Sequence, residues 1–455
     1  MIDRQSEIGL STDLYQLTMG ASYRQLGITG RATFSLFVRG LPPQRNYLVA
    51  AGLDDALDRL SSVRFHPEAL SYLQSTGQIR PEFIDALKDF KFTGDIWAIP
   101  EGRIVFADEP LLEAQGTIIE AQIAETILVN ALHYATLVAT KASRCVSAAP
   151  GKSLVEFGLR RTASIDAGLI AARASYLAGF DATSNLLAGE RFGIPVAGTV
   201  AHSFIEIFPT ELDAFRAFGA TFPGDVTLLI DTYDTLRGAR NAAIVAKELA
   251  ADGRRLRAVR LDSGDLVTLS QEVRSILDEH GLQSVDIFAS GGLDESDVAE
   301  LIDAGAPIDA FGIGTRLGTS ADVPSIDMVY KLVQFDDQPK LKLSTGKATL
   351  VGPKQVWRRT ASDGTFEADL IARRDEAPPG ATWEPLLTPV MRNGERIGSF
   401  DLSERRDGHR IERQRMPASL FSLDEPVAYP VSLSDELKAI QRRTTAEVRA
   451  RELGE

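Results

Sequence analysis

Apolar segments that end in residues able to bind a phosphate or carry a charge recur along the middle of this chain. A parallel strand of a (β/α) barrel is buried on both faces and delivers its polar residues at its carboxyl end. The repetition therefore predicts an α/β fold, a TIM-like (β/α) barrel of regular or irregular form, with its active site on that rim. The six segments are residues 154–161, 196–203, 228–234, 258–265, 287–292 and 311–315.

The chain is longer than one barrel requires. A barrel takes about 250 residues, and this chain has 455, so a second α+β domain is expected. We predict an N-terminal α+β domain over residues 1–115, the barrel over 116–330, and a C-terminal segment over 331–455 that packs back on the N-terminal domain. Local patterns predict helices over residues 12–27 and 46–60, and a charged C-terminal helix capped by Ser434.

Composition restricts the partners and the location. The formal net charge is −14, whereas binding a nucleic acid would need a concentrated basic face that this sequence does not display. Cys145 is the only cysteine, which excludes an internal disulfide and a zinc site built from several cysteines. No run approaches the length of a membrane span, and the N-terminus lacks the features of a secretion signal. We therefore expect a cytoplasmic protein that binds neither membranes nor nucleic acids.

Two glycine-containing turns follow the last two predicted strands. Ser290, Gly291 and Gly292 end the first strand, and Gly314 and Thr315 end the second. Backbone N–H groups that glycine leaves accessible, together with a helix N-terminus, form the usual phosphate site at this rim of a barrel. Either turn alone could be only a tight connection, but two on adjacent strands favour a phosphate ligand.

Several motifs along the chain resemble those of nicotinate phosphoribosyltransferases, in the same order. They occupy residues 12–19, 156–161, 179–185, 198–203, 259–265 and 312–315. Such a coincidence is far more specific than any one motif. The resemblance implies transfer of phosphoribose from 5-phosphoribosyl 1-diphosphate to nicotinate, giving nicotinate mononucleotide and diphosphate for NAD salvage. It also implies ATP as co-substrate, Mg²⁺ as cofactor and a transient phosphohistidine.

The resemblance assigns roles to individual residues. His202 matches the phosphorylated histidine, although a lone histidine is more often a core residue satisfied by hydrogen bonds. Arg260 and Thr199 match positions that contact nicotinate, and Arg160 and Arg161 add positive charge beside its carboxylate.

Tyr15 matches a tyrosine that stacks on the substrate in the active site of a neighbouring subunit. A homodimer with Tyr15 contributed across the interface is therefore implied, although without the resemblance Tyr15 would be read as a core aromatic residue. The two glycine turns would bind the 5-phosphate of the ribose, and Thr315 matches a residue that contacts the phosphoribosyl substrate.

Carboxylates follow two of the predicted strands. Asp262 is expected to act in catalysis beside the ribose, because bond cleavage should pass through an oxocarbenium-like state that a negative charge stabilises. Asp231 and Asp265 are candidate Mg²⁺ ligands, since Mg²⁺ takes few protein ligands and keeps its waters. Ion pairs with nearby surface arginines are the alternative, and for Asp234 they are about as plausible.

Three other interpretations stay open. A nicotinamide-using phosphoribosyltransferase is the closest, because such enzymes also have an aspartate in the glycine-rich turn that contains Asp181. A non-catalytic barrel that only binds a phosphosugar should have lost His202, Arg260 or Asp262, and all three are present. A phosphosugar isomerase or lyase would share the phosphate site but has no use for Tyr15 or for a phosphorylatable His202.

Overall fold

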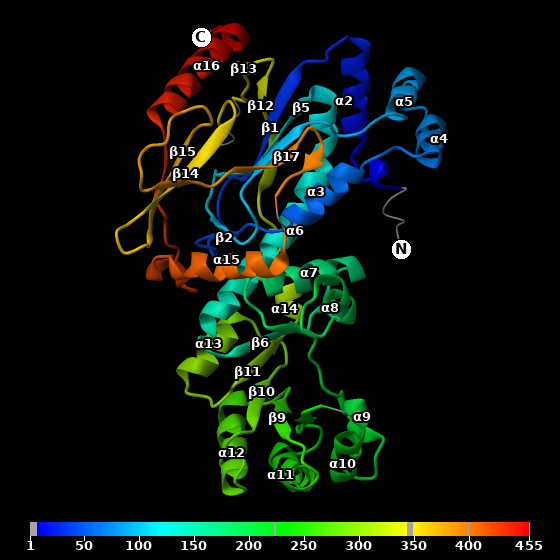
Figure 1. Ribbon diagram of the computed structural model, residues 1–455, viewed down its shortest axis with the longest axis vertical. Coiled ribbons are helices and arrows are strands. Elements are labelled where there is room, and N and C mark those ends of the chain that lie inside the picture. The colour runs from blue at the N-terminus through cyan, green and yellow to red at the C-terminus, as the bar shows by residue number, and fades with distance from the viewer. Residues whose placement is uncertain (1–6, 223, 344–348, 399, 455) are drawn as a thin grey trace. The chain divides into compact units, whose positions relative to one another are not determined.

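The structure is a computed structural model that describes residues 7–222, 224–343, 349–398 and 400–454 (Figure 1). The chain divides into two compact units, one formed by Met1–Thr140 with Ser325–Glu455 and the other by Lys141–Pro324. Helix α6 (Ile118–Ala148) contains the first boundary. Residues 116–140, assigned above to the barrel, therefore lie in the unit that holds both ends of the chain.

The unit of residues 141–324 is built on six parallel strands in the order β7-β6-β11-β10-β9-β8. These strands consist largely of apolar residues whose side chains are buried. Leu228, Ile287 and Phe311, for example, are at most 1% exposed. The carboxyl ends of parallel strands lie at one edge of the sheet, here called the carboxyl edge. The strands are β6 (Ser153–Glu156), β7 (Ala182–Thr183), β8 (Val226–Leu229), β9 (Leu256–Leu261), β10 (Asp286–Ala289) and β11 (Ala310–Ile313).

Helices connect these strands, as the parallel arrangement requires. Asp265 and Asp294 cap two of them by accepting backbone hydrogen bonds from their first turns. The helical segments are η2 (Leu159–Arg161), α7 (Ile165–Leu177), α8 (Leu186–Phe192), α9 (His202–Glu206), α10 (Glu211–Thr221), α11 (Thr235–Ala251), α12 (Leu266–Glu279), α13 (Glu295–Asp303) and α14 (Thr315–Gly318).

The sheet is an open half-barrel of six parallel strands, so the predicted (β/α) barrel is confirmed in its parallel α/β character but is not a complete TIM-like barrel. Within the described ranges no ladder joins the edge strands β7 and β8. Residues 196–203, predicted as a strand, contribute one isolated bridge from Val196 to Thr183 and then run irregularly to α9. That prediction is wrong because the segment is not buried on both faces: Val196 is 54% exposed. Strand β7, which the sequence did not predict, forms the edge instead.

The other unit holds a seven-stranded antiparallel sheet in the order β13-β12-β1-β5-β3-β17-β18. Strand β1 pairs with β5 on one side and β12 on the other, so residues from both ends of the chain share this sheet. Its strands are β1 (Arg31–Val38), β3 (Asp95–Ala98), β5 (Pro110–Thr117), β12 (Met328–Phe335), β13 (Gln338–Pro339), β17 (Thr388–Arg392) and β18 (Glu395–Arg396).

Two smaller sheets complete this unit. One has the order β16-β14-β15-β19 and the other pairs β2 with β4. Their strands are β2 (Leu48–Val49), β4 (Ile104–Val105), β14 (Lys354–Thr360), β15 (Phe366–Arg373), β16 (Trp383–Pro385) and β19 (Val431–Leu433). The helical segments are η1 (Ile8–Leu10), α2 (Leu14–Gln25), α3 (Leu53–Ser62), α4 (Pro67–Thr76), α5 (Pro81–Leu87), α15 (Leu402–Gln414), η3 (Ala418–Phe421) and α16 (Asp435–Leu453).

Local sequence signals predicted some of these elements better than others. Ser434 caps α16 by accepting a hydrogen bond from the backbone of Leu437 at 3.0 Å, as predicted. The helix predicted over 46–60 begins only at Leu53, because Gly52 has a φ of 91° and the residues before it form β2.

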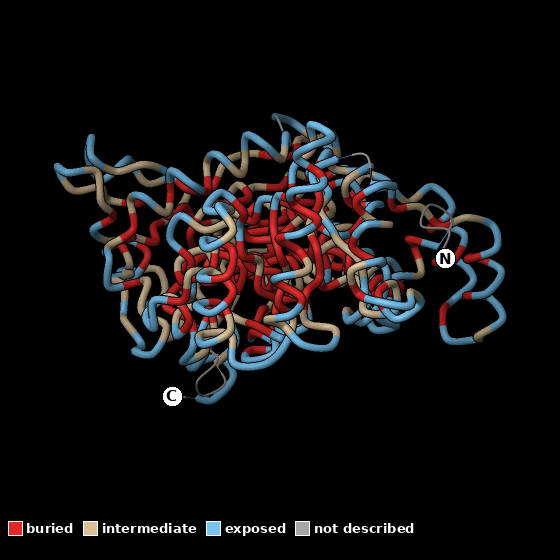
Figure 2. The backbone as a smooth tube through the Cα atoms, turned by 90° about the horizontal axis from the view of Figure 1, so that it is seen from below, coloured by how far each residue is buried: buried red, intermediate tan, exposed pale blue. Residues whose placement is uncertain are grey.

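Helix α6 is the one described helix that is long and apolar enough to cross a membrane by length and composition alone. In its most apolar window, 67% of the residues are buried inside the protein. Figure 2 shows the buried positions gathered in the interior and the exposed positions along the outside of the chain. Helix α6 is therefore apolar because it packs in the core of the protein.

Candidate active site

Arg260, Asp262 and Ser290 form one hydrogen-bonded cluster at the carboxyl edge. Arg260 and Asp262 come from the end of β9, and Ser290 follows β10, its neighbour in the sheet. Arg260 Nε donates to Ser290 Oγ at 2.8 Å, and Ser290 Oγ donates to Asp262 Oδ1 at 2.6 Å. Arg260 also pairs directly with Asp262 Oδ1, at 2.5 Å. The sequence predicted all three residues, and only the register of β9 with β10 brings them together.

The cluster keeps Asp262 ionised. Burial by itself would raise the pKa of Asp262, but the hydrogen bond from Ser290 and the charge of Arg260 outweigh it and hold that pKa below its usual value. Ser290 is only 2% exposed and its hydroxyl is engaged in the cluster. Its hydroxyl therefore acts on Arg260 and Asp262 in this structure, whereas the sequence analysis placed it on a phosphate.

His202 stands beside this cluster at the first residue of α9. Its Nε2 lies 3.8 Å from Asp262 Oδ2, and its Nδ1 lies 3.1 Å from Thr232 Oγ1. The side chain of His202 is 40% exposed, so the ring remains accessible to a ligand. Thr232 was not identified from the sequence, although it follows β8 directly after Ile230 and Asp231.

Asp231 and Asp265 differ in what their oxygens do. Asp231 Oδ2 accepts hydrogen bonds from the backbone of Asp262 at 2.7 Å and from Ser263 Oγ at 3.0 Å. Its Oδ1 is shielded from solvent and has no hydrogen-bond partner among the described residues. Asp265 instead uses both oxygens to cap α12, where it accepts from Thr268 Oγ1 at 2.7 Å. Asp231 thus keeps one carboxylate oxygen without a hydrogen-bond partner among the described residues, whereas both oxygens of Asp265 already accept hydrogen bonds.

No group of three or more His, Cys, Asp or Glu side chains able to hold a metal occurs in the ranges that the structure describes. Mg²⁺ needs few protein ligands when it is bound together with phosphates of a substrate. A site with a single carboxylate is therefore compatible with this preference of Mg²⁺.

The glycine turns lie where the sequence placed them, after the adjacent strands β10 and β11. Gly291 has a φ of 108°, and a Cβ there would lie 2.0 Å from the carbonyl oxygen of Asp262. A Cβ on Gly314 would lie 2.7 Å from the carbonyl oxygen of Phe157. Glycine is thus needed for close backbone approach at both turns. Gly292, with a φ of 79°, and the exposed Thr315 complete the two turns.

The loop after β6 carries Arg160 and Arg161, both exposed, on the short segment η2. Glu156, at the end of β6, is fully buried and accepts hydrogen bonds from Thr183 Oγ1 at 2.6 Å and from the backbone of Gly158. Burial raises the pKa of Glu156. Sequence reasoning gave Glu156 no role, although it joins this loop to β7.

Phe157 and Thr199 also lie close to Arg260. The guanidinium carbon of Arg260 is 5.8 Å from the centroid of the Phe157 ring, and Arg260 Nη1 donates to the carbonyl of Val200, beside Thr199, at 3.4 Å. Thr199 donates its own hydroxyl to the carbonyl of Thr227 at 2.8 Å. The edge therefore combines a cation with an aromatic wall, which are the features that an aromatic carboxylate requires.

Asp181 is separated from these residues. Its carboxylate accepts hydrogen bonds from Ser153 Oγ at 2.8 Å and from the backbone of Leu154 at 3.1 Å. Ser153 and Leu154 begin β6, so Asp181 lies at the opposite end of that strand from the carboxyl edge.

Tyr15 lies in the other unit, on α2. Its side chain is 46% exposed and lines a cavity of about 340 Å³ together with Asp13, Glu125 and His133. Partial burial, followed by the charge of Glu125 and a hydrogen bond to it, raises the pKa of Tyr15 to about 12. Tyr15 is therefore a protonated, accessible aromatic residue rather than the core residue that the alternative interpretation assumed.

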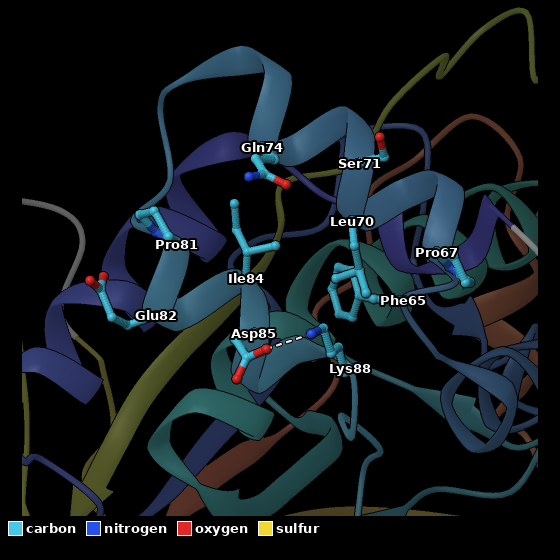
Figure 3. Close-up of a pocket in the computed structure, with 10 residues that line it drawn as sticks. All are labelled: Phe65, Pro67, Leu70, Ser71, Gln74, Pro81, Glu82, Ile84, Asp85 and Lys88. Carbon is cyan, nitrogen blue, oxygen red and sulfur yellow. Dashed lines mark hydrogen bonds and ion pairs between the residues drawn. The ribbon is translucent and has the colours of Figure 1, made fainter.

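A second cavity, of about 770 Å³, lies in the same unit between α4 and α5. Figure 3 shows Phe65, Leu70 and Ile84 lining it, with an ion pair between Lys88 and Asp85 at 2.5 Å. None of the predicted site residues lines this cavity. Its walls are largely apolar, and its cation, Lys88, is already paired with Asp85.

Comparisons with known proteins agree with the chemistry of the carboxyl edge. Residues 10–133 match the family described as nicotinate phosphoribosyltransferase (NAPRTase) N-terminal domain, and residues 152–349 match the nicotinate phosphoribosyltransferase (NAPRTase) family. The chain is 45% identical to nicotinate phosphoribosyltransferase pncB2 of Mycobacterium tuberculosis, over 98% of this chain and 97% of that protein. It is 41% identical to the Bacillus subtilis nicotinate phosphoribosyltransferase, over 82% and 78% of the two chains.

Solved structures show the same likeness. The crystal structure of human nicotinic acid phosphoribosyltransferase superposes with a TM-score of 0.85 at 32% identity, covering 95% of this chain and 99% of that one. A nicotinate-nucleotide pyrophosphorylase from Pyrococcus furiosus superposes with a TM-score of 0.73 at 26% identity, covering 90% and 96%.

Proposed function

This chain belongs to the nicotinate phosphoribosyltransferase family and is an enzyme of NAD salvage, and from that premise we propose which residues perform the reaction. The ring nitrogen of nicotinate forms a bond to the anomeric carbon of 5-phosphoribosyl 1-diphosphate, and the bond from that carbon to the diphosphate oxygen breaks. Diphosphate leaves with the electron pair. No general base is needed, because the ring nitrogen already offers a lone pair.

The cluster at the carboxyl edge supports this assignment of roles. Arg260, with Phe157 beside it, binds the carboxylate and ring of nicotinate, and Thr199, Arg160 and Arg161 complete that side of the site. Ionised Asp262 stabilises the positive charge that develops on the ribose as the bond to diphosphate breaks. The turns at Gly291–Gly292 and Gly314–Thr315 hold the 5-phosphate.

We infer that ATP phosphorylates His202 during turnover. The observation that carries this proposal is the position of the His202 ring, between Asp262 and Thr232 and still 40% exposed. Imidazole is nucleophilic near neutral pH without a strong base, so an accessible, oriented ring suits a phosphoryl acceptor. Mg²⁺, held with Asp231, would neutralise phosphate charge.

The same premise supports a cytoplasmic homodimer. The half-exposed Tyr15 would stack on the substrate of a neighbouring subunit, as the family resemblance implies, and its phenol stays protonated at neutral pH. Sedimentation of the purified protein tests the dimer. Mixing Tyr15→Ala protein with His202→Ala protein tests the shared site, because only a mixed dimer would combine an intact Tyr15 with an intact His202 and regain activity.

The first experiment measures product formation from 5-phosphoribosyl 1-diphosphate and Mg²⁺, comparing nicotinate with nicotinamide, each with and without ATP. We expect nicotinate mononucleotide to form preferentially, and faster with ATP. His202→Ala should abolish the ATP hydrolysis that accompanies turnover, while His280→Ala, the same change on the distant α12 connection, should not. Unchanged ATP dependence in His202→Ala would remove His202 from this role.

The nicotinamide-using alternative is disfavoured by the position of Asp181, whose carboxylate is bonded at the start of β6. The binding-only alternative is disfavoured by the intact contacts among Arg260, Asp262 and Ser290. A preference for nicotinamide in the first experiment would support the nicotinamide-using alternative. No turnover of either base would support the binding-only alternative.

A further inference from the structure

The His202 ring contacts a different side chain at each of its two nitrogens. Nδ1 lies 3.1 Å from Thr232 Oγ1 and Nε2 lies 3.8 Å from Asp262 Oδ2. We propose that Thr232 is a positioning residue for the phosphorylation of His202: its hydroxyl holds the ring in the one orientation and tautomer from which phosphoryl transfer occurs. This inference rests on the proposed role of His202.

The place of Thr232 is fixed by the strand that precedes it. Ile230, the first residue after β8, donates its backbone N–H to the carbonyl of Arg260 at 3.2 Å. Asp231 accepts the backbone N–H of Asp262 at 2.7 Å. Two successive residues are thus bonded to the neighbouring β9 segment, and Thr232 follows them directly. Its hydroxyl is therefore presented to His202 from a supported backbone.

The negative charge of Asp262, 3.8 Å from Nε2, favours one tautomer of the ring. Asp262 Oδ1 is occupied by Ser290 and Arg260, which leaves Oδ2 directed at His202 Nε2. A carboxylate beside Nε2 stabilises the form in which Nε2 carries the proton. Nδ1 then has the lone pair, and the Thr232 hydroxyl donates to it. Together the two contacts keep the tautomer and the ring plane defined before ATP arrives.

Without Thr232 the ring would lose one of these two restraints. Rotation about the bond that carries an imidazole is broad and roughly two-fold, and the ring is 40% exposed. It could then flip or turn toward solvent, and fewer rings would be ready to react.

Phosphoryl transfer requires a ring nitrogen with a free lone pair. That nitrogen forms a bond to the γ-phosphorus of ATP, the bond from this phosphorus to the bridging oxygen breaks, and ADP leaves with the electron pair. The other ring nitrogen keeps its proton. When the phosphoryl group arrives at Nδ1, the Thr232 O–H turns from the nitrogen to a phosphoryl oxygen. The Thr232 hydroxyl therefore donates a hydrogen bond both before and after phosphoryl transfer. Valine has no hydroxyl and cannot donate either bond.

The test compares four variants in the full-length protein. Thr232→Val removes the hydroxyl and keeps the shape, Thr232→Ser keeps the hydroxyl, and Thr235→Val makes the same change at the first residue of α11. His202→Ala is the reference for loss of the acceptor. Two quantities are measured: phosphoenzyme formed from γ-labelled ATP in the first turnover, and the ratio of the turnover rates with and without ATP.

We expect Thr232→Val to lower the rate of phosphoenzyme formation at least roughly fivefold, the effect of one hydrogen bond. Thr232→Ser should restore it and Thr235→Val should not change it. Normal phosphoenzyme formation in Thr232→Val, with none in His202→Ala, would overturn the role of Thr232 and leave that of His202 intact. Phosphoenzyme that persists in His202→Ala would instead overturn the proposed function of His202. Should Thr232→Val fold poorly, Thr232→Ala and Thr232→Ser give the same comparison.

Discussion

The hydroxyl of Ser290 donates to Asp262 Oδ1 at 2.6 Å while it accepts from Arg260 Nε at 2.8 Å. The sequence analysis predicted that Ser290 binds a phosphate. In the structure its hydroxyl instead links the guanidinium of Arg260 to the carboxylate of Asp262. Hydrogen bonds to charged groups contribute about 1.5–3 kcal/mol. Ser290 therefore contributes substantially to the geometry and ionisation of both partners.

Ser290→Ala should lower kcat/KM roughly tenfold, because Arg260 and Asp262 each lose one hydrogen bond. The hydrogen bond from Ser290 lowers the pKa of Asp262, so its removal raises that pKa. The acidic limb of the pH–rate profile should then move to higher pH. Ser296→Ala, on the exposed start of α13, is the matched control. A profile that stays in place would contradict this account of the Asp262 pKa.

Asp231→Asn should raise the Mg²⁺ concentration needed for half-maximal activity, because Asp231 Oδ1 is shielded and has no hydrogen-bond partner in the described part of the chain. Asp265→Asn should not share this effect. The main expected consequence of Asp265→Asn is a free energy of unfolding lower by about 1 kcal/mol, because the cap of α12 is weakened. Titrations with Mg²⁺ and denaturant unfolding of both variants separate the two roles. A larger Mg²⁺ effect at Asp265 would reverse the assignment.

Arg358→Met should destabilise the protein by about 3–5 kcal/mol, because it leaves buried carboxylates without their cation. Arg358 Nη2 is 2.6 Å from Asp369 Oδ2, and both side chains are 0% exposed. The neighbouring Arg359 pairs with Glu367 at the surface, with side chains 40% and 48% exposed. Arg359→Met should therefore cost less than about 1 kcal/mol. Equal losses in denaturant unfolding would show that burial of the Arg358 pair does not matter.

His409 should make the folded state less stable in acid. Burial lowers the pKa of His409 to about 4, below its unfolded value of about 6.5. Between these values the unfolded state binds more protons, so stability falls as pH falls from about 6.5 to about 4, by about 3 kcal/mol in total. Its Nδ1 contacts the carbonyl of Gly102 at 2.8 Å. His409→Gln should show a smaller loss between pH 7 and pH 4.5 in denaturant unfolding, and an equal loss would refute the assignment.

Local signals predicted elements wherever the pattern depended on neighbours in the sequence. The cap at Ser434 and the strands of the parallel sheet that end before Asp231, Asp262 and Ser290 are examples. The prediction was wrong for residues 196–203, where Val196 is exposed. An apolar run indicates a buried strand only when both of its faces are covered, and the sequence does not show what covers it.

The site was predicted as a list of residues, and their contacts were not. Glu156 and Thr232 had no assigned role because neither a buried carboxylate nor a hydroxyl is distinctive in sequence. The sequence also did not show that the oxygens of Asp181 accept hydrogen bonds at the start of β6, or that those of Asp265 cap α12.

The sequence by itself determined the family, the parallel α/β character of residues 141–324, and the chemical types present at the strand ends. These depend on the order of residues and on burial patterns along one strand or helix. Only the tertiary structure decided that the sheet is open, that Ser290 meets Asp262, and that Thr232 meets His202. Hydrogen bonds act over about 3 Å, so which groups pair depends on strand order and register, which bring together residues about 30 positions apart in the sequence.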